Sequence, residues 1–326
     1  MKQYNQEFPI ERMAEIMGIS RSGYYRFLKA EPSARDREEQ RLLEKIRLIH
    51  QTSFETYGSP RIHAELKDNG ETCSRRRVAR LMKKHGIVAK MSKRFKKTTQ
   101  QAEKPYFMAT DLIQQDFKAQ EPNEAWVSDI TYVLTQEGWI YCAMILDLFS
   151  RKIVGLAIDS CITAELVLGA LRPALTRRRP PAGIIHHSDR GSQYTSRALK
   201  LLADNYGVQL SMGKVANAYD NAVAESFFHT LKTELIYFQS YKNLEEAKMN
   251  IFHYIYGFYN QTRRHSTLGY LSPRQFENNF YADKKTLFPV SIKCLQDQSF
   301  KWASVTCSNC TVGKKLKPWS TEATWL

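Results

Sequence analysis

The sequence predicts a mixed α/β domain with helices on the faces of its sheet, preceded by an all-helical segment. Three strand-like apolar runs, at 126–134, 139–149 and 153–159, follow one another through short connections. Helical and strand-like runs then alternate as far as residue 235. A three-strand meander followed by such alternation indicates a mixed sheet with flanking helices.

Residues 1–50 form the first predicted segment, which has the spacing of a helix-turn-helix. The stretch PIERMAEIMGISRSGYYRFLK (9–29) predicts two short helices around a glycine turn, with Ser20 as the N-cap of the second helix. Many helical hairpins share this spacing. A charged helix follows at about 36–50. The expected small core of the hairpin consists of Met13, Met17, Ile19 and Tyr24.

Residues 51–90 predict a second helix-turn-helix-like segment. RIHAELKDNG (61–70) predicts a helix that ends at Gly70, and SRRRVARLMKKHG (74–86) a helix capped by Ser74. Cations that converge on one helix face favour contact with DNA phosphates, although a solvated basic face has the same pattern. The cations opposite the apolar face of this second helix are Arg75, Arg76, Arg80, Lys83 and Lys84.

Charge is concentrated in the N-terminal third of this 326-residue chain, whose net charge is +15. Residues 1–104 carry 24 basic and 13 acidic residues, whereas residues 105–326 carry 24 and 20. This asymmetry points to a polyanionic partner, nucleic acid first. Residues 91–120 are expected to be a basic linker along DNA.

The remaining bulk features predict a cytoplasmic protein. The N-terminus is polar, and the densest apolar run, WIYCAMILDLF, is too short to span a membrane. Cys73, Cys142 and Cys161 are expected to be simple thiols. The tail at 282–326 has no clear periodicity, and its single CxxC (Cys307 and Cys310) lacks the further ligands that a structural zinc site needs.

The predicted core domain, residues 121–281, contains two acids in positions that suggest chemistry. Asp129 lies inside a strand with apolar residues on both faces, where a carboxylate is costly unless it is paired, hydrogen-bonded to Thr or Tyr, or bound to a metal. Asp189 follows the strand GIIHH (183–187), at the end of the sheet where ligands collect. A turn or N-cap role for Asp189 is the alternative.

The helix within ANAYDNAVAESFFHTLKTEL (216–235) carries a third such acid. Ala224, Phe228, Leu231 and Leu235 share one face, which is expected to pack on the sheet. Glu225 lies at the edge of that face, and Lys232 has almost the same azimuth, where it could meet a phosphate. Glu234 points the opposite way and is expected to be solvated, whereas Asp220 is expected to cap the helix.

Asp129, Asp189 and Glu225 could therefore converge at one edge of the sheet. Oxygen ligands of this kind select Mg²⁺ or Mn²⁺ over zinc. Two such ions can activate an oxygen nucleophile and stabilise the leaving oxygen in phosphoryl transfer. The pattern thus indicates metal-dependent phosphoryl transfer on a polyanionic substrate.

The strings WVSDITY, HHSDRGSQY, NAYDNAVAESFFHTLKTEL and YNQTRRHSTLGYLSP resemble bacterial insertion-sequence transposases of the two-reading-frame type, specifically the second-frame product. GISRSGYYRFL and SRRRVARLMKKHGI match the same group, so the resemblance covers about residues 10–280. Two aspartates followed, after 35 residues, by a glutamate resemble the DDE core of retroviral integrases.

This resemblance implies a ribonuclease-H-like five-stranded mixed sheet and a catalytic triad of Asp129, Asp189 and Glu225 that binds two Mg²⁺ or Mn²⁺ ions. It implies that a metal-activated water cleaves DNA at the element end and that the resulting 3′-OH attacks another strand. The C-terminal signature around Arg263 has either a structural or a catalytic role. The implied DNA contacts within the core are Lys232, Arg190, Gln193, Tyr194, Asn221, Arg263, Arg264 and His265.

The implied partners are the terminal inverted repeats, target DNA, further copies of the chain on DNA, and a first-frame transposase protein. Two alternatives remain open at this stage. One is a non-catalytic DNA-binding protein with a relic integrase core, and the other is an RNA-directed nuclease on the same fold.

Overall fold

The computed structural model describes residues 1–90 except 5, 30 and 32, residues 107–213 except 115, and residues 222–287. Asp220, Asn221, most of the expected linker and the CxxC of the tail lie outside these residues. None of the described helices is both long and apolar enough to cross a membrane. Cys73, Cys142 and Cys161 are free thiols, as expected.

The N-terminal hairpin consists of α1 (Ile10–Ile16) and α2 (Arg21–Lys29), after a short 3₁₀ turn η1 (Lys2–Tyr4). The Ser20 hydroxyl accepts a hydrogen bond from the Gly23 N–H at 3.0 Å, which confirms the predicted cap. The expected core is only partly correct, because Tyr24 is buried whereas Met17 and Ile19 are 60% and 46% exposed. Helices of this length bury few side chains, and within α1 and α2 only Ala14 and Tyr24 are buried.

Helices α3 (Ala34–Thr52), α4 (Ser59–Asp68) and α5 (Arg75–Lys84) pack around a common core. A capping box between Ser33 and Asp36 begins α3, and Ser74 caps α5 by accepting from the Arg77 N–H. We therefore propose that this unit begins near residue 34, since the boundary expected at residue 50 falls inside α3. Its buried core includes Leu42, Ile46, Ile62, Leu66 and Leu81.

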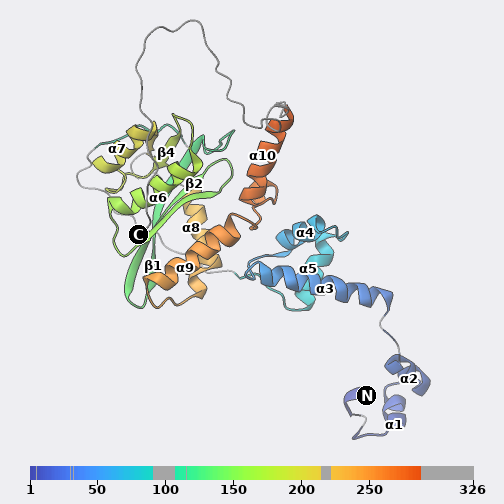
Figure 1. The fold of residues 1–326 in the computed structure, drawn as a ribbon. Helices are drawn as coiled ribbons and strands as arrows, with labels where there is room; N and C mark the ends of the chain where they lie inside the picture. The colour runs from blue at the N-terminus through green and yellow to red at the C-terminus, as the bar shows by residue number, and fades with distance from the viewer. Residues whose placement is uncertain are drawn as a thin grey trace, which may run out of the picture. The chain divides into compact units, whose positions relative to one another are not determined.

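The core domain contains a five-stranded sheet of order β3-β2-β1-β4-β5 (Figure 1). Strands β1, β2 and β3 form an antiparallel meander, and β4 and β5 continue the sheet parallel to β1. The predicted mixed sheet with flanking helices is confirmed, in the ribonuclease-H-like arrangement. The strands are β1 (Ala125–Thr135), β2 (Gly138–Asp147), β3 (Ile153–Asp159), β4 (Ile185–Ser188) and β5 (Gln209–Met212).

Helices cover both faces of the sheet, and alternate residues of β1 face different layers. Trp126 packs among α6 (Ala164–Arg178) and α7 (Arg197–Tyr206). Val127 and Val133 pack in the other layer, which holds the helices that follow β5. Those elements are α8 (Ala222–Glu234), the 3₁₀ turn η2 (Ile236–Phe238), α9 (Leu244–Phe252), the π-helix η3 (His253–Tyr259) and the 3₁₀ turn η4 (Ser266–Leu268).

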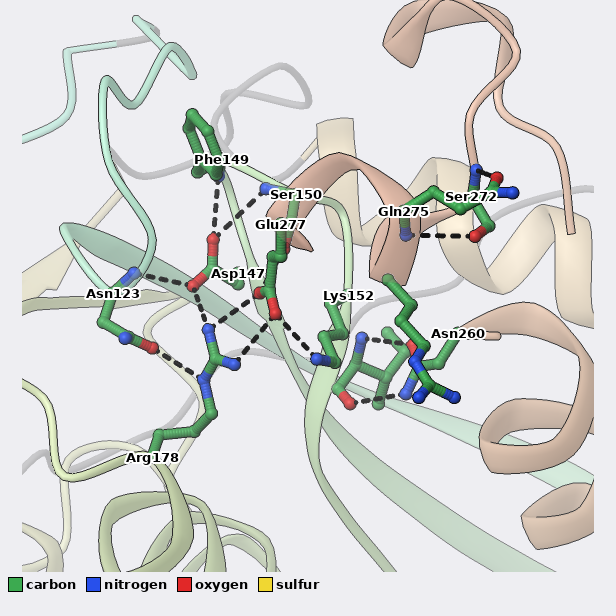
Figure 2. Close-up of polar contacts among 12 residues, drawn as sticks. Asn123, Asp147, Phe149, Ser150, Lys152, Arg178, Asn260, Ser272, Gln275 and Glu277 are labelled. Atoms are coloured by element: carbon green, nitrogen blue, oxygen red, sulfur yellow. Dashed lines mark hydrogen bonds and ion pairs between the residues drawn. The ribbon is translucent and has the colours of Figure 1, made fainter. Parts of the chain in front are cut away.

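A buried polar network attaches α10 (Pro273–Leu287) to the sheet, as Figure 2 shows. The Glu277 carboxylate accepts from the Ser150 hydroxyl at 2.8 Å, from the Lys152 ammonium at 2.7 Å and from two nitrogens of Arg178 at 2.8 and 3.0 Å. Arg178 also lies 3.5 Å from the fully buried carboxylate of Asp147. The first turns of α10 are thus fixed to the β2–β3 connection and to the end of α6.

Candidate functional site

Asp129 of β1 and Asp189, which follows β4 directly, lie toward the same end of two neighbouring strands. The parallel register of β1 and β4 ends with Val127 opposite His187, two residues before each aspartate, and the charge of Asp189 acts on Asp129. Asp129 follows the alternation of Val127 and therefore faces the layer that contains α8. The backbone N–H of Ile130 donates to Asp129 at 2.8 Å, and that of Gly191 donates to Asp189 at 2.9 Å.

Glu225 occupies the first turn of α8, whose buried residues Ala224, Phe227, Phe228 and Leu231 pack on the α8 side of the sheet. Its charge reaches Asp129. Burial, and then the charges of Asp189 and Glu225, raise the pKa of Asp129 to about 8, although the Ile130 N–H and the Lys232 ammonium act to lower it. The pKa of Asp189 is also raised, mainly by burial. The three predicted acids therefore share one partly buried region.

The fit of this region to a metal depends on its donor atoms. In the parts of the chain that the structure describes, no group of three or more His, Cys, Asp and Glu side chains is arranged to hold an ion. The charges of Asp189 and Glu225 act on Asp129, but the three carboxylates are not drawn into one coordination sphere, as expected for like charges in poorly solvated surroundings. An all-oxygen donor set with a carboxyl of raised pKa suits a hard divalent cation, which would relieve that repulsion.

Lys232 lies on the same side of α8 and close to the acids. Its ammonium is 4.6 Å from the centroid of the Tyr132 ring, and its charge acts on Asp129. Burial lowers the pKa of Lys232, while the neighbouring Asp129 raises it. Helical geometry predicted that Lys232 lies on the same side of the helix as Glu225, and in the structure Lys232 lies close to Asp129. The contact of Lys232 with DNA remains a prediction.

The residues around Asp189 have different environments. Tyr194 is only 1% exposed, and its hydroxyl shares a hydrogen bond of 3.1 Å with Ser128. The prediction that Tyr194 contacts DNA is therefore wrong in this arrangement, since the ring fills the core beneath the first aspartate. Arg190 and Gln193 are half-buried, with hydrogen bonds to the carbonyls of Gly213 and Ile162, and their DNA contacts remain predictions.

The two arginines of the C-terminal signature are buried in ion pairs. Arg263 is 3% exposed and donates to both carboxylate oxygens of Glu234, at 2.6 and 2.8 Å. Arg264 is 4% exposed and pairs with Glu65 and Asp68 of α4, at 2.5 and 2.6 Å. We correct the prediction that these arginines contact DNA, because their guanidinium groups are already paired inside the protein.

His265 completes the same signature and also makes its contacts inside the protein. It is half-buried, and one of its ring nitrogens lies 3.0 Å from Arg263. Burial, followed by the charge of Arg263, lowers the pKa of His265 to about 2, so the ring is neutral. The structural role that the sequence left open for this signature is the one that the contacts support.

Glu234 was predicted from helical geometry to be solvated, and this prediction is wrong. Its side chain is 9% exposed rather than solvated. Besides Arg263, it accepts from the Tyr254 hydroxyl at 2.7 Å and pairs with Arg61 of α4 at 3.3 Å. An azimuth on one helix shows which side faces away from the sheet but not what covers that side, and here α4 and the π-helix cover it.

The basic face of α5 is exposed. Arg80 and Lys84 pair with Glu39 of α3, the second at 3.4 Å. A residual positive surface on this helix is compatible with phosphate contact. The remaining exposed cations of this face are Arg75, Arg76 and Lys83.

Models of known protein families match almost the whole described core. An integrase core domain matches residues 119–218 and a second integrase core model matches residues 206–273. An HTH-like domain matches residues 37–95, a range that begins inside α3. The chain is therefore an integrase-core protein with an HTH-like domain before the core.

Its relatives narrow this class. The insertion element IS600 uncharacterized 31 kDa protein of Shigella sonnei is 42% identical over 269 residues, which cover 82% of this chain and 98% of the relative. Transposase InsF for insertion sequence IS3A of Escherichia coli (strain K12) is 36% identical over 280 residues, 85% of this chain and 97% of the relative. The chain belongs to the insertion-sequence transposase family of IS3 InsF.

Solved integrase structures are more distant. A simian T-cell lymphotropic virus intasome in complex with the PP2A regulatory subunit B56 gamma is 14% identical, with a TM-score of 0.43 over 72% of this chain and 74% of that chain. The HTLV-2 integrase catalytic core domain in complex with magnesium is 15% identical, with a TM-score of 0.39 over 49% of this chain and 99% of that chain.

Proposed function

We propose that this transposase catalyses 3′-end cleavage and strand transfer of its own insertion element, with Asp129, Asp189 and Glu225 as the catalytic carboxylates. One observation carries the proposal. The parallel pairing of β1 and β4 brings the two aspartates to the same end of neighbouring strands, and the charges of Asp189 and Glu225 both act on Asp129. Carboxylates from three separate elements have little reason to share a partly buried region unless a cation joins them.

The oxygen donors fit Mg²⁺ or Mn²⁺, and we propose that the three carboxylates hold two such ions. When bound, these ions would activate an oxygen nucleophile and stabilise the leaving oxygen of the phosphodiester. The protein contributes rigidity and charge. Ser128 precedes Asp129 on β1, and its hydrogen bonds to Tyr194 and to the Met144 carbonyl fix the strand at this point. Lys232 offers positive charge to the reacting strand.

DNA is the proposed substrate and partner. The HTH-like domain and the exposed cations of α5 would hold the terminal inverted repeats, while the core receives the reacting strand and the target. We further propose that several copies act together on DNA, that a first-frame transposase protein joins them, and that the assembly works on the nucleoid in the cytoplasm.

The test is an oligonucleotide strand-transfer assay with Mg²⁺, using the inverted repeats of the flanking DNA. Asp129→Asn, Asp189→Asn and Glu225→Gln should each lower product formation by about a hundredfold or more, because each removes a metal ligand. The matched control is Asp159→Asn, an exposed aspartate at the end of β3, which should retain activity.

DNA binding is measured in parallel to separate the competing functions. If Asp189→Asn formed as much product as the unmodified chain while binding was unchanged, the carboxylates would not be catalytic. Binding without any product in the unmodified chain would favour a DNA-binding protein with a relic core. Preferred cleavage of an RNA–DNA hybrid would favour the nuclease alternative.

A further inference from the structure

An aromatic pair stands at the end of the β1–β2 hairpin. The rings of Tyr132 and Trp139 are 5.1 Å apart between centroids and nearly perpendicular, at 84°. Trp139 remains 51% exposed, although it is among the largest apolar side chains of the protein. The Lys232 ammonium lies 4.6 Å from the centroid of the Tyr132 ring. The Tyr132 ring thus contacts both the exposed indole of Trp139 and the ammonium of Lys232.

Lys232 connects this pair to the proposed catalytic carboxylates. Tyr132 lies three residues after Asp129 on the same strand, and the charge of Lys232 acts on Asp129. A third aromatic residue, Tyr237 of η2, lies nearby and is 42% exposed; burial and then the neighbouring Tyr132 raise its pKa. The Lys232 ammonium therefore lies against the aromatic pair and also acts on the first of the candidate metal ligands.

Hairpin stability alone does not explain the arrangement. Cross-strand aromatic pairs stabilise antiparallel strands through the surface that they bury. Here the indole leaves half of its surface in solvent, and the residue directly opposite it, Leu134, is 59% exposed. Exposed rings beside cations are the chemistry that binds single-stranded nucleic acid, in which bases stack on rings and phosphates meet the cations.

We propose that Trp139 is a stacking platform for an unpaired base of the DNA strand whose phosphate meets Lys232. The Tyr132 ring packs nearly perpendicular to the indole and has the Lys232 ammonium over its face. The place of DNA in this inference rests on the proposed function, whereas the stacking itself involves no metal and no bond cleavage. Its role would be to hold an unpaired base at the end of the element, because bases stack on exposed rings whatever their sequence.

The test uses the full chain without divalent metal and a duplex that carries a short single-stranded overhang with 2-aminopurine in it. Stacking on Trp139 should quench the fluorescence of this base. Trp139→Ala should abolish most of the quenching and weaken binding of the overhang probe by about tenfold, with little change for a blunt duplex. Trp139→Tyr should retain most of both effects, because every base stacks on a phenol ring as well.

Leu134→Ala is the matched control, because Leu134 is the exposed cross-strand partner of Trp139 and has no ring. It should leave quenching and affinity unchanged. The proposal is overturned if Trp139→Ala quenches and binds like the unmodified chain, if it weakens blunt and overhanging duplexes equally, or if Leu134→Ala has the same effect as Trp139→Ala.

The outcome is independent of the catalytic assay. Asp189→Asn should quench like the unmodified chain, because it leaves the aromatic pair in place. A failure of stacking alongside an intact requirement for the carboxylates would remove only this inference. Intact stacking in a chain whose activity does not depend on Asp189 would remove only the proposed catalytic site.

Discussion

Two glutamates of α8 have contrasting environments. Glu225 lies with the candidate catalytic acids, whereas Glu234 is enclosed by Arg263, Tyr254 and Arg61. Burial acts to raise the pKa of Glu234, but its hydrogen bonds with Arg263 and Tyr254 and the nearby arginine charges lower it below the usual 4.5. Glu234 is therefore an ionised structural acid, and its function is to hold segments together.

Glu234→Gln should destabilise the protein at pH 7 by about 3 kcal/mol, because it leaves the buried charge of Arg263 uncompensated. A carboxyl whose pKa is lowered by folding contributes stability above its unfolded pKa. That contribution is lost as pH falls through the folded pKa. The difference between the two proteins in urea denaturation should therefore be full above pH 4.5 and shrink below it.

The control for this prediction is Glu245→Gln in α9, whose carboxylate is 73% exposed. Its effect should stay within about 0.5 kcal/mol at every pH, since exposed ion pairs contribute little. An equal loss of stability in both variants, or a loss in Glu234→Gln that does not change with pH, would contradict the structural role of Glu234.

Single residues also show where sequence reasoning succeeds and where it stops. The positions of Asp129 and Asp189 follow from local signals, namely an apolar strand around the first and a strand end before the second. The burial of Arg263 and Arg264 depends on Glu234 and on Glu65, which lie 29 and 199 positions away. A sequence shows that an arginine is charged, but the partner that neutralises it is set by packing.

At the scale of elements, the Glu277 network anchors the first turns of α10 to the core domain. Burial opposes ionisation of Glu277, but the hydrogen bonds and charges of Arg178 and Lys152 lower its pKa. The rings of Phe276 and Phe280 pack on Phe149, with centroids 5.0 and 4.9 Å away. Polar and aromatic contacts from successive turns of the helix thus act on the same β2–β3 connection.

Glu277→Ala should cost about 3–5 kcal/mol in the free energy of unfolding, because it leaves the cations of Arg178 and Lys152 without their carboxylate. Limited proteolysis should then cut α10 earlier than in the unmodified protein. Asn278→Ala changes the next residue, which is exposed, and should alter neither quantity. Comparable effects of the two substitutions would show that the network does not hold the helix.

Most elements could be predicted because their signals are local. Apolar runs bounded by turns mark the strands, and Ser74 and Gly86 bracket α5. The π-helix His253–Tyr259 could not, because its buried residues resemble those of an ordinary amphipathic helix. Asn260 follows this helix directly, and its side-chain amide hydrogen-bonds to the backbone N–H and carbonyl of Ile153, both at 2.9 Å. That pairing arises from tertiary contact with β3.

On the scale of the whole described chain, the HTH-like domain and the integrase core share hydrophobic surface. Phe54, which follows α3, packs against Phe258 with centroids 4.9 Å apart and against Tyr254 at 6.3 Å. The Tyr57 hydroxyl accepts from the backbone N–H of Arg264 at 2.8 Å. Buried residues of both parts belong to one cluster, so the two parts should unfold together.

Calorimetry should therefore show one main transition for the HTH-like domain and the core. Phe54→Ala should separate it into two, because it removes the ring that packs against both Phe258 and Tyr254. Leu48→Ala is the control, since Leu48 lies on α3 and is 61% exposed. A single transition in Phe54→Ala, or two in the unmodified chain, would refute coupled unfolding.

The contacts of Phe54, Tyr57 and Arg61 also bear on how this protein can be produced. A recombinant fragment that begins at residue 107 would lose all three, and with them the cover over Tyr254, Phe258 and Glu234. The newly bared aromatic surface should make such a fragment self-associate and precipitate. A fragment that begins at residue 33 keeps the cap of α3 and this cover, and should remain monodisperse in gel filtration.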